Sequence, residues 1–171
     1  GGTGTGAAPV VAQIAKDIGA IVIGTVTMPF KIERARVDKA EFGLQQLRQV
    51  SDTVIVIDNN RLVSIAGNLP IKQAFAVANE LISTMIKGIV ETIAIPSLVN
   101  LDYADVKAIM TNGGVAAIGV GASDTNSRVE EAVKGALSNP LLDISYKGAT
   151  GALIHISGGP EMTLDEISKV G

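Results

Sequence analysis

The sequence opens with Gly1-Gly2-Thr3-Gly4-Thr5-Gly6 and continues without a break into a stretch with helical spacing. Glycines let the backbone turn with positive φ and approach a ligand closely, and the N–H groups at the start of a helix face an anion. Pro9 suits a first helical turn, and Gly19 suits the end of the helix. Apolar residues repeat between them with helical spacing: Val10, Val11, Ile14 and Ile18. The pattern predicts a phosphate-binding loop in front of a helix.

The alternation of glycine and threonine differs from two common phosphate-binding motifs. The dinucleotide fingerprint G-x-G-x-x-G needs a two-residue gap before its third glycine, and a Walker A loop needs Lys and Ser or Thr after its last glycine. Neither is present here. A flexible glycine-rich linker is the alternative, and the helical pattern that follows argues against it.

Composition predicts a folded protein with a sizeable core, since 47% of the 171 residues are hydrophobic and 18% are charged. The net charge of −3 and the scattered Lys and Arg residues argue against a nucleic-acid partner. The absence of cysteine excludes disulfides and thiolate metal sites. No apolar run reaches the roughly 18 residues of a membrane-spanning helix, so we expect a cytoplasmic protein without direct membrane insertion.

Two short apolar, β-branched runs at residues 20–27 and 53–57 predict buried strands, with a helix over 32–50 between them. This spacing favours a parallel sheet, whose carboxyl edge carries the polar residues 58–61. Residues 70–94 form the longest helical pattern and predict a central helix that bridges two domains. Beyond it we expect helices over 102–110, 127–137 and near the end of the chain, and strands over 115–121 and 151–157; His155 is assigned no role.

The predicted fold class is therefore α/β: part of a parallel-sheet domain, joined by the long helix to a smaller α+β domain. The expected limits are 1–69 for the first domain, 70–95 for the connecting helix and 96–171 for the second domain. The chain starts inside the predicted loop and stops inside a predicted helix, so we expect a fragment truncated at both ends.

Asp102 and Asp105 lie three residues apart, on one face of a predicted first helical turn. Two carboxylates there can position and polarise a water molecule or hold a cation. The alternative is structural, because Asp is favoured as an N-cap and acidic residues in a first turn suit the helix dipole.

Several segments resemble the tubulin/FtsZ family over essentially the whole chain. The opening is similar to the family's Gly-Gly-Gly-Thr-Gly-Thr-Gly loop without its first glycine, and Asn100-Leu101-Asp102-Tyr103-Ala104-Asp105 is similar to its Asn-x-Asp-x-x-Asp segment. Met28-Pro29-Phe30-Lys31-Ile32-Glu33 resembles the Pro-Phe-x-x-Glu ribose loop. Ile57-Asp58-Asn59-Asn60-Arg61-Leu62 resembles the loop that contacts guanine, and Ala74-Phe75-Ala76-Val77-Ala78-Asn79 resembles the start of the central helix.

The resemblance implies a GTPase that binds GTP/GDP and Mg²⁺ and polymerises head to tail, with each active site shared between two subunits. The residues implied for phosphates are Gly2, Thr3, Gly4, Thr5 and Gly6. Those implied for ribose and base are Glu33, Arg36 (or Arg34), Asn59, Phe75 and Asn79. Asp102 and Asp105, supported by Asn100, are implied as catalytic carboxylates that act on the water at the neighbouring subunit's nucleotide.

At the level of the cell, the resemblance implies self-assembly into a division ring at midcell, together with membrane-tethering and division-site proteins as partners. Two alternatives stay open. One is a filament or scaffold protein of the same superfamily that serves cell shape; the other is a dinucleotide-binding oxidoreductase domain.

Overall fold

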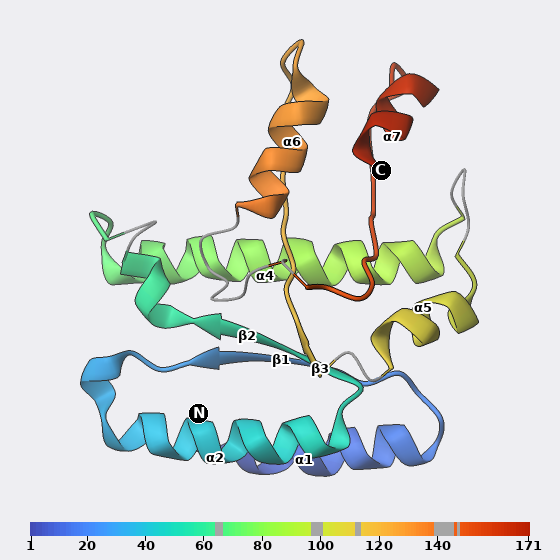
Figure 1. The fold of residues 1–171 in the computed structure, drawn as a ribbon. Helices are drawn as coiled ribbons and strands as arrows, with labels where there is room; N and C mark the ends of the chain where they lie inside the picture. The colour runs from blue at the N-terminus through green and yellow to red at the C-terminus, as the bar shows by residue number, and fades with distance from the viewer. Residues whose placement is uncertain (64–66, 97–100, 112–113, 139–145, 147) are drawn as a thin grey trace.

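Among the residues that the structure describes, three parallel strands form a central sheet (Figure 1). The computed structural model describes residues 1–63, 67–96, 101–111, 114–138, 146 and 148–171. The sheet has the order β1 (Ile23–Met28), β2 (Thr53–Asp58) and β3 (Gly114–Ala116). Ile23 lies opposite Thr53 and Met28 opposite Asp58, so β1 and β2 end at the same edge. The parallel sheet predicted from the two buried runs is confirmed.

Helices cover both faces of this sheet. In Figure 1, α1 (Gly2–Asp17) and α2 (Ala35–Val50) lie below the strands and α4 (Ile71–Ala94) lies above them. Ala12, Leu47 and Val54 form the buried core on the first side, and Ile57, Leu62 and Met85 form it on the second. Successive side chains of β2 point to opposite faces of the sheet, and both faces are covered by helices. Both sets of side chains are therefore apolar, so the strand is a continuous apolar run in the sequence.

The long central helix is confirmed as α4, whose 24 residues span about 36 Å at 1.5 Å per residue. In the described part of the chain three further helices follow: α5 (Tyr103–Met110), α6 (Arg128–Leu137) and α7 (Leu164–Val170). Short 3₁₀ turns, η1 (Lys31–Glu33) and η2 (Asn59–Arg61), follow β1 and β2 at the carboxyl edge. None of the helices in the described part of the chain combines the length and apolar character needed to cross a membrane.

The opening segment differs from the predicted loop, because α1 already begins at Gly2. The Gly1 carbonyl accepts hydrogen bonds from the Thr5 amide (3.0 Å) and from the Thr5 hydroxyl (2.8 Å), which closes a first helical turn. Among the described glycines only Gly19 and Gly148 have positive φ. Glycine permits a turn but does not impose one, and here helical hydrogen bonds satisfy the backbone instead. The prediction that Pro9 lies in the first turn is likewise wrong, since it lies inside the helix.

The apolar stripe predicted for α1 is largely exposed. Ala12 is buried against the sheet, whereas the larger side chains of the stripe are 59% to 80% exposed: Val10, Val11, Ile14 and Ile18. Small residues thus make the contact with the sheet, and the bulky residues face away from it.

The strand predicted over 151–157 is absent, because these residues lie in no ladder of the described sheet. An alternating pattern favours extended backbone, but a strand also needs a neighbour whose N–H and C=O groups face it. Side chains hold this segment on α4 instead: His155 Nδ1 lies 3.0 Å from the Thr92 hydroxyl, and His155 Nε2 lies 3.7 Å from the Glu91 carboxylate. The strand predicted over 115–121 is also shorter than expected; it ends at Ala116 and pairs with β2.

Candidate functional site

The segments that follow β1 and β2 meet at the carboxyl edge of the sheet. The Lys31 amide of η1 donates to Asn60 Oδ1 of η2 (3.0 Å). Asp58 Oδ1 in turn accepts from the Asn60 amide (2.8 Å) and from Asn60 Nδ2 (2.6 Å). The ring of Phe30 meets the ring of Phe75 edge to face, with centroids 6.1 Å apart. The structure therefore joins the predicted ribose loop, guanine loop and central helix.

Glu33 and Arg36, both predicted to contact the nucleotide, are paired with each other. The Glu33 carboxylate accepts from the Phe30 amide (3.1 Å) and from Arg36 Nη1 (2.8 Å). Arg36 remains 78% exposed, so its guanidinium can leave this pair for a phosphate or sugar at little cost. Arg34 has a φ of 34°, an uncommon conformation for a residue with a side chain, and stands at the entry to α2.

The other base-contacting candidates lie on neighbouring elements. Phe75 is 38% exposed on the first turns of α4, and Asn79 is exposed one turn later. Asn59 is the first residue of η2. Asn60, which received no role from the sequence, organises this loop through its contacts with Lys31 and Asp58. The repeated Asn-Asn after an Asp was the available signal, since Asx side chains often close turns.

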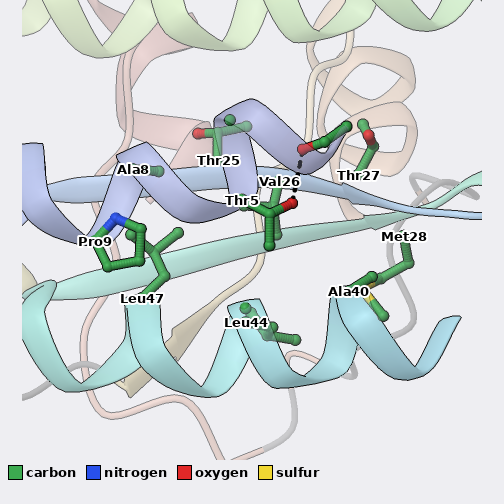
Figure 2. Close-up of a pocket in the computed structure, with 13 residues that line it drawn as sticks. Thr5, Ala8, Pro9, Thr25, Val26, Thr27, Met28, Ala40, Leu44 and Leu47 are labelled. Carbon is green, nitrogen blue, oxygen red and sulfur yellow. Dashed lines mark hydrogen bonds between the residues drawn. The ribbon is translucent and has the colours of Figure 1, made fainter. Parts of the chain in front are cut away.

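The start of α1 lies beside the end of β1, where a cavity of about 290 Å³ opens between α1, α2 and β1 (Figure 2). The side chains that line it are largely apolar: Ala8, Pro9, Val26, Met28, Ala40, Leu44 and Leu47. Such a lining does not suit a charged phosphate. The amides of Gly2, Thr3 and Gly4 belong to the first helical turn and lack intrahelical acceptors, so they offer the anion-binding groups of this segment. Thr5 contributes less than expected, since its hydroxyl is bonded to Gly1.

Asp102 and Asp105 lie at the opposite, amino edge of the sheet. Asp102 is the N-cap of α5, and its Oδ1 accepts from the Asp105 amide (2.8 Å). The adjacent Tyr103 hydroxyl accepts from the Ile21 amide (2.9 Å), two residues before β1 begins. Both carboxylates are exposed, and the capping role of Asp102 leaves the outer face of its carboxylate accessible. Asn100 lies outside the described residues.

The predicted site residues thus fall into two groups. Those for phosphate, ribose and base gather at the carboxyl edge, and the two carboxylates lie at the amino edge, so one chain does not bring them together. Among the described residues, no three His, Cys, Asp or Glu side chains form a cluster that could hold a metal ion.

A charged pair outside both groups joins α6 to α7. Arg128 donates to Glu166 through Nε (2.6 Å) and through Nη2 (2.9 Å). The hydrogen bond from Arg128, followed by that from the Thr163 amide, lowers the pKa of Glu166 from 4.5 to about 2. The pKa of Glu131 is also lowered, by hydrogen bonds from Ser123 and Thr125. Burial raises the pKa of Tyr146, whose hydroxyl donates to the Ala136 carbonyl (2.9 Å).

Two family models match the chain. The model of the Tubulin/FtsZ family, GTPase domain, matches residues 1–67, and the model of the FtsZ family, C-terminal domain, matches residues 114–171. The chain belongs to the FtsZ family. The resemblance predicted from the opening loop and the Asn100–Asp105 segment is thereby confirmed, as is the tubulin/FtsZ-like α/β fold.

Relatives and solved structures agree with the FtsZ assignment. The chain is 60% identical to Cell division protein FtsZ 2 of Methanocaldococcus jannaschii, over all of this chain and 46% of the relative. It is 57% identical to Cell division protein FtsZ 2 of Halobacterium salinarum, over 99% of this chain and 43% of the relative. An FtsZ dimer structure from M. jannaschii superposes with a TM-score of 0.92 at 51% identity, over 99% of this chain and 50% of that one. The chain spans about half the length of the curated relatives it matches.

Proposed function

We propose that this FtsZ-family chain is the central part of a cytoskeletal protein of cell division that binds and hydrolyses GTP and polymerises head to tail. The match of residues 1–67 to a GTPase domain and the similarity to cell division proteins support this proposal. We also propose a division into a nucleotide domain (1–69), a connecting helix (70–95) and a second domain (96–171); the first model ends at residue 67 and the second begins at residue 114. A dinucleotide-binding oxidoreductase has no support, because both matching models are of tubulin/FtsZ type.

The observation that carries the proposal is the separation of the two groups of candidate residues. Glu33, Asn59 and Phe75 lie at the carboxyl edge of the parallel sheet, and Asp102 and Asp105 lie at the amino edge. A contact in which the amino edge of one subunit faces the carboxyl edge of the next brings the two groups together. Such a heterologous contact builds an open filament when its repeated rotation does not close into a ring.

At the carboxyl edge, each set of candidate residues would bind one part of the nucleotide. The amides of Gly2, Thr3 and Gly4 would donate to phosphate oxygens, with Thr5 and Gly6 extending the same turn. Phe75 would stack on the base, and the amides of Asn59 and Asn79 would donate to and accept from its edge. Glu33 would bind the ribose hydroxyls, with Arg36 or Arg34 nearby.

The neighbouring subunit would supply the groups that act on water. Asp102 and Asp105 would orient the attacking water and accept its proton while its oxygen bonds to the γ-phosphorus. The bond from that phosphorus to the β-bridging oxygen breaks, which gives GDP and phosphate. Asn100 would support the two carboxylates.

Mg²⁺ fits this site only as an ion carried by the nucleotide. The described residues offer no cluster of three metal-ligating side chains, and Mg²⁺ commonly keeps several waters and binds through substrate phosphates. When bound, it would neutralise phosphate charge. In the cell we propose a cytoplasmic protein at the midcell division ring that is attached to the membrane by tethering proteins and works with other division-site proteins, as its similarity to cell division proteins suggests.

The test is GTP turnover measured against protein concentration for the full-length protein and its Asp105→Ala variant. A shared site predicts a threshold concentration below which turnover is negligible. Asp105→Ala should bind GTP with unchanged affinity and lose most of its turnover, by roughly a hundredfold or more if the carboxylate acts as a general base. Turnover that is proportional to concentration from zero would overturn the shared site.

A further inference from the structure

Tyr103 ties the first turn of α5 to the connection between α1 and β1. Its hydroxyl accepts a hydrogen bond from the Ile21 amide (2.9 Å) and donates one to the Gly19 carbonyl (3.3 Å). These partners lie 82 and 84 residues away in the sequence. One side chain therefore closes a contact between two elements that are distant along the chain.

The backbone groups that Tyr103 contacts lie between the end of α1 and the start of β1. The Gly19 amide bonds to the Lys16 carbonyl (2.9 Å) and the Ala20 amide to the Ala15 carbonyl (3.0 Å), with Gly19 at a φ of 84°, so α1 ends in a Schellman motif. The next amide, of Ile21, is the one that Tyr103 accepts from.

Asp52 accepts a hydrogen bond from the next amide along the chain, that of Val22. The distance from the Val22 nitrogen to Asp52 Oδ2 is 2.8 Å. Two successive amides at the amino edge are thus satisfied by side chains from two other parts of the chain, α5 and the entry to β2. The amino edge is therefore built by long-range side-chain contacts as well as by the sheet itself.

The first turn of α5 carries the two carboxylates of the proposed GTPase. Asp102 caps this turn by accepting from the Asp105 amide, and Val106 is fully buried on its other side. Tyr103 lies between Asp102 and Val106 in the sequence, and its hydroxyl makes the polar contact to the amino edge of the sheet. Cap, hydroxyl and buried valine together fix the direction in which the carboxylates point.

We propose that Tyr103 is a positioning residue for GTP hydrolysis, acting through its hydroxyl to hold Asp102 and Asp105 in the orientation that the neighbouring subunit's nucleotide requires. The inference rests on the proposed function. Because carboxylate and nucleotide belong to different subunits, their mutual geometry depends on how firmly α5 is held on its own subunit, and small displacements of catalytic groups are costly in rate.

The hydroxyl can be removed without disturbing the fold. Tyr103 is 47% exposed, so water can replace its hydroxyl at the Ile21 amide and the Gly19 carbonyl. Phenylalanine keeps the ring and removes only the two hydrogen bonds. The chain offers a matched control, because its only other tyrosine, Tyr146, also uses its hydroxyl on a backbone carbonyl, that of Ala136 in α6.

The experiment compares Tyr103→Phe and Tyr146→Phe in the full-length protein. Steady-state GTP turnover is measured per polymerised subunit, after sedimentation, across a range of GTP concentrations. For Tyr103→Phe we expect kcat to fall roughly three- to tenfold, because water replaces part of what the two lost hydrogen bonds contribute, with KM unchanged. Tyr146→Phe should keep both values.

Amide hydrogen exchange gives a second readout that does not depend on turnover. In Tyr103→Phe the Ile21 amide should exchange faster, while the Val22 amide, held by Asp52, should not change. Unchanged exchange at Ile21 would overturn the proposed anchor.

The kinetic outcomes separate this inference from the function on which it rests. An unchanged kcat in Tyr103→Phe, a rise in KM alone, or an equal loss in both tyrosine variants would overturn the positioning role. If the unmodified protein turns over GTP and Asp105→Ala abolishes that turnover while Tyr103→Phe does not alter it, only the inference fails. If the unmodified polymer does not hydrolyse GTP, the proposed function fails, and the inference fails with it.

Discussion

At the scale of single residues, Gly43 sets how closely α1 and α2 approach each other. It is buried in α2, and a Cβ added there would overlap the side-chain methyl of Thr5. That methyl cannot turn away without breaking the hydrogen bond between the Thr5 hydroxyl and the Gly1 carbonyl. Gly43 is thus required by a close approach and not by backbone conformation.

Alanine substitutions at two helical glycines should change the free energy of unfolding in opposite directions. Gly43→Ala should lower the free energy of unfolding by about 1–3 kcal/mol because it overpacks the α1–α2 contact. Gly88→Ala, in α4, should raise it by about 0.5–1 kcal/mol, since the nearest atom to an added Cβ is His155 Cδ2 at 4.0 Å and alanine is the better helix former. Urea unfolding of both variants of the full-length protein measures the two changes; the same sign for both would contradict the prediction.

The sequence indicated which segments meet at the candidate site, but not the contacts that join them. Phe75, Glu33 and Asn59 lie on segments that the structure brings together. The link between these segments depends on Asn60 and Phe30, which lie in the quoted motifs but were assigned no contact. The hydroxyl of Tyr103 could not be assigned either, since its partners lie more than 80 residues away.

At the scale of elements, α7 is held on α6 by one bidentate ion pair. Arg128 reaches both carboxylate oxygens of Glu166, and the Thr163 amide also donates to that carboxylate (2.8 Å). Glu166 and Thr163 complete a capping box at the start of α7. One carboxylate therefore both caps a short helix and anchors it to its neighbour.

The lowered pKa of Glu166 predicts a pH dependence of stability. Because the pKa is about 2 in the folded chain against 4.5 ordinarily, the ionised carboxylate stabilises the folded state above pH 4.5, and this contribution is lost as the pH falls from 4.5 toward 2. Glu166→Gln should therefore lower Tm above pH 4.5 and show a shallower loss of Tm over this window. Asp165→Asn, which removes an exposed neighbouring carboxylate paired with Lys169, is the control. Equal slopes for Glu166→Gln and the unmodified protein would refute the assignment.

Elements with strong periodicity were predicted well, and those that depend on a partner were not. The helix α2, the long α4 and the strands β1 and β2 follow from spacing alone, although only β2 is largely buried and β1 is mostly half-buried. Residues 151–157 alternate like a strand, yet they pair with no strand of the described sheet, and His155 contacts α4 instead. The helical start of α1 was missed because glycine and threonine are poor helix formers, and their propensity is overridden here by the hydrogen bonds to Gly1.

At the scale of the whole molecule, the proposed site exists only where two subunits meet. The start of α1, η1 and η2 lie at one edge of the sheet, and the first turn of α5 lies at the other (Figure 1). A substitution at one edge should then inactivate only the contacts in which that edge takes part, and leave the subunit's other edge functional.

Mixing two inactive variants tests this arrangement. Gly4→Asp places a carboxylate where phosphate is proposed to bind, and an added Cβ at Gly4 meets nothing within 4 Å, so the fold should tolerate it. Asp105→Ala removes the acid from the other edge. In a random equal mixture, about a quarter of the contacts join an intact nucleotide edge to an intact carboxylate edge, so GTP turnover should recover up to about that fraction. No recovery above the sum of the separate variants would contradict a site shared in this way.

The proposed contact joins the carboxyl edge of the sheet in one subunit to the amino edge in the next, so a polymer built in this way has a direction. The two ends of the proposed polymer would differ chemically. One end would present a nucleotide that no neighbouring carboxylate reaches, and the other would present Asp102 and Asp105 without a nucleotide to act on. The nucleotide at the first end would be spared until another subunit arrives. A growing polymer of this kind would therefore keep unhydrolysed GTP at the end that exposes the nucleotide. Subunits farther from that end would hold GDP.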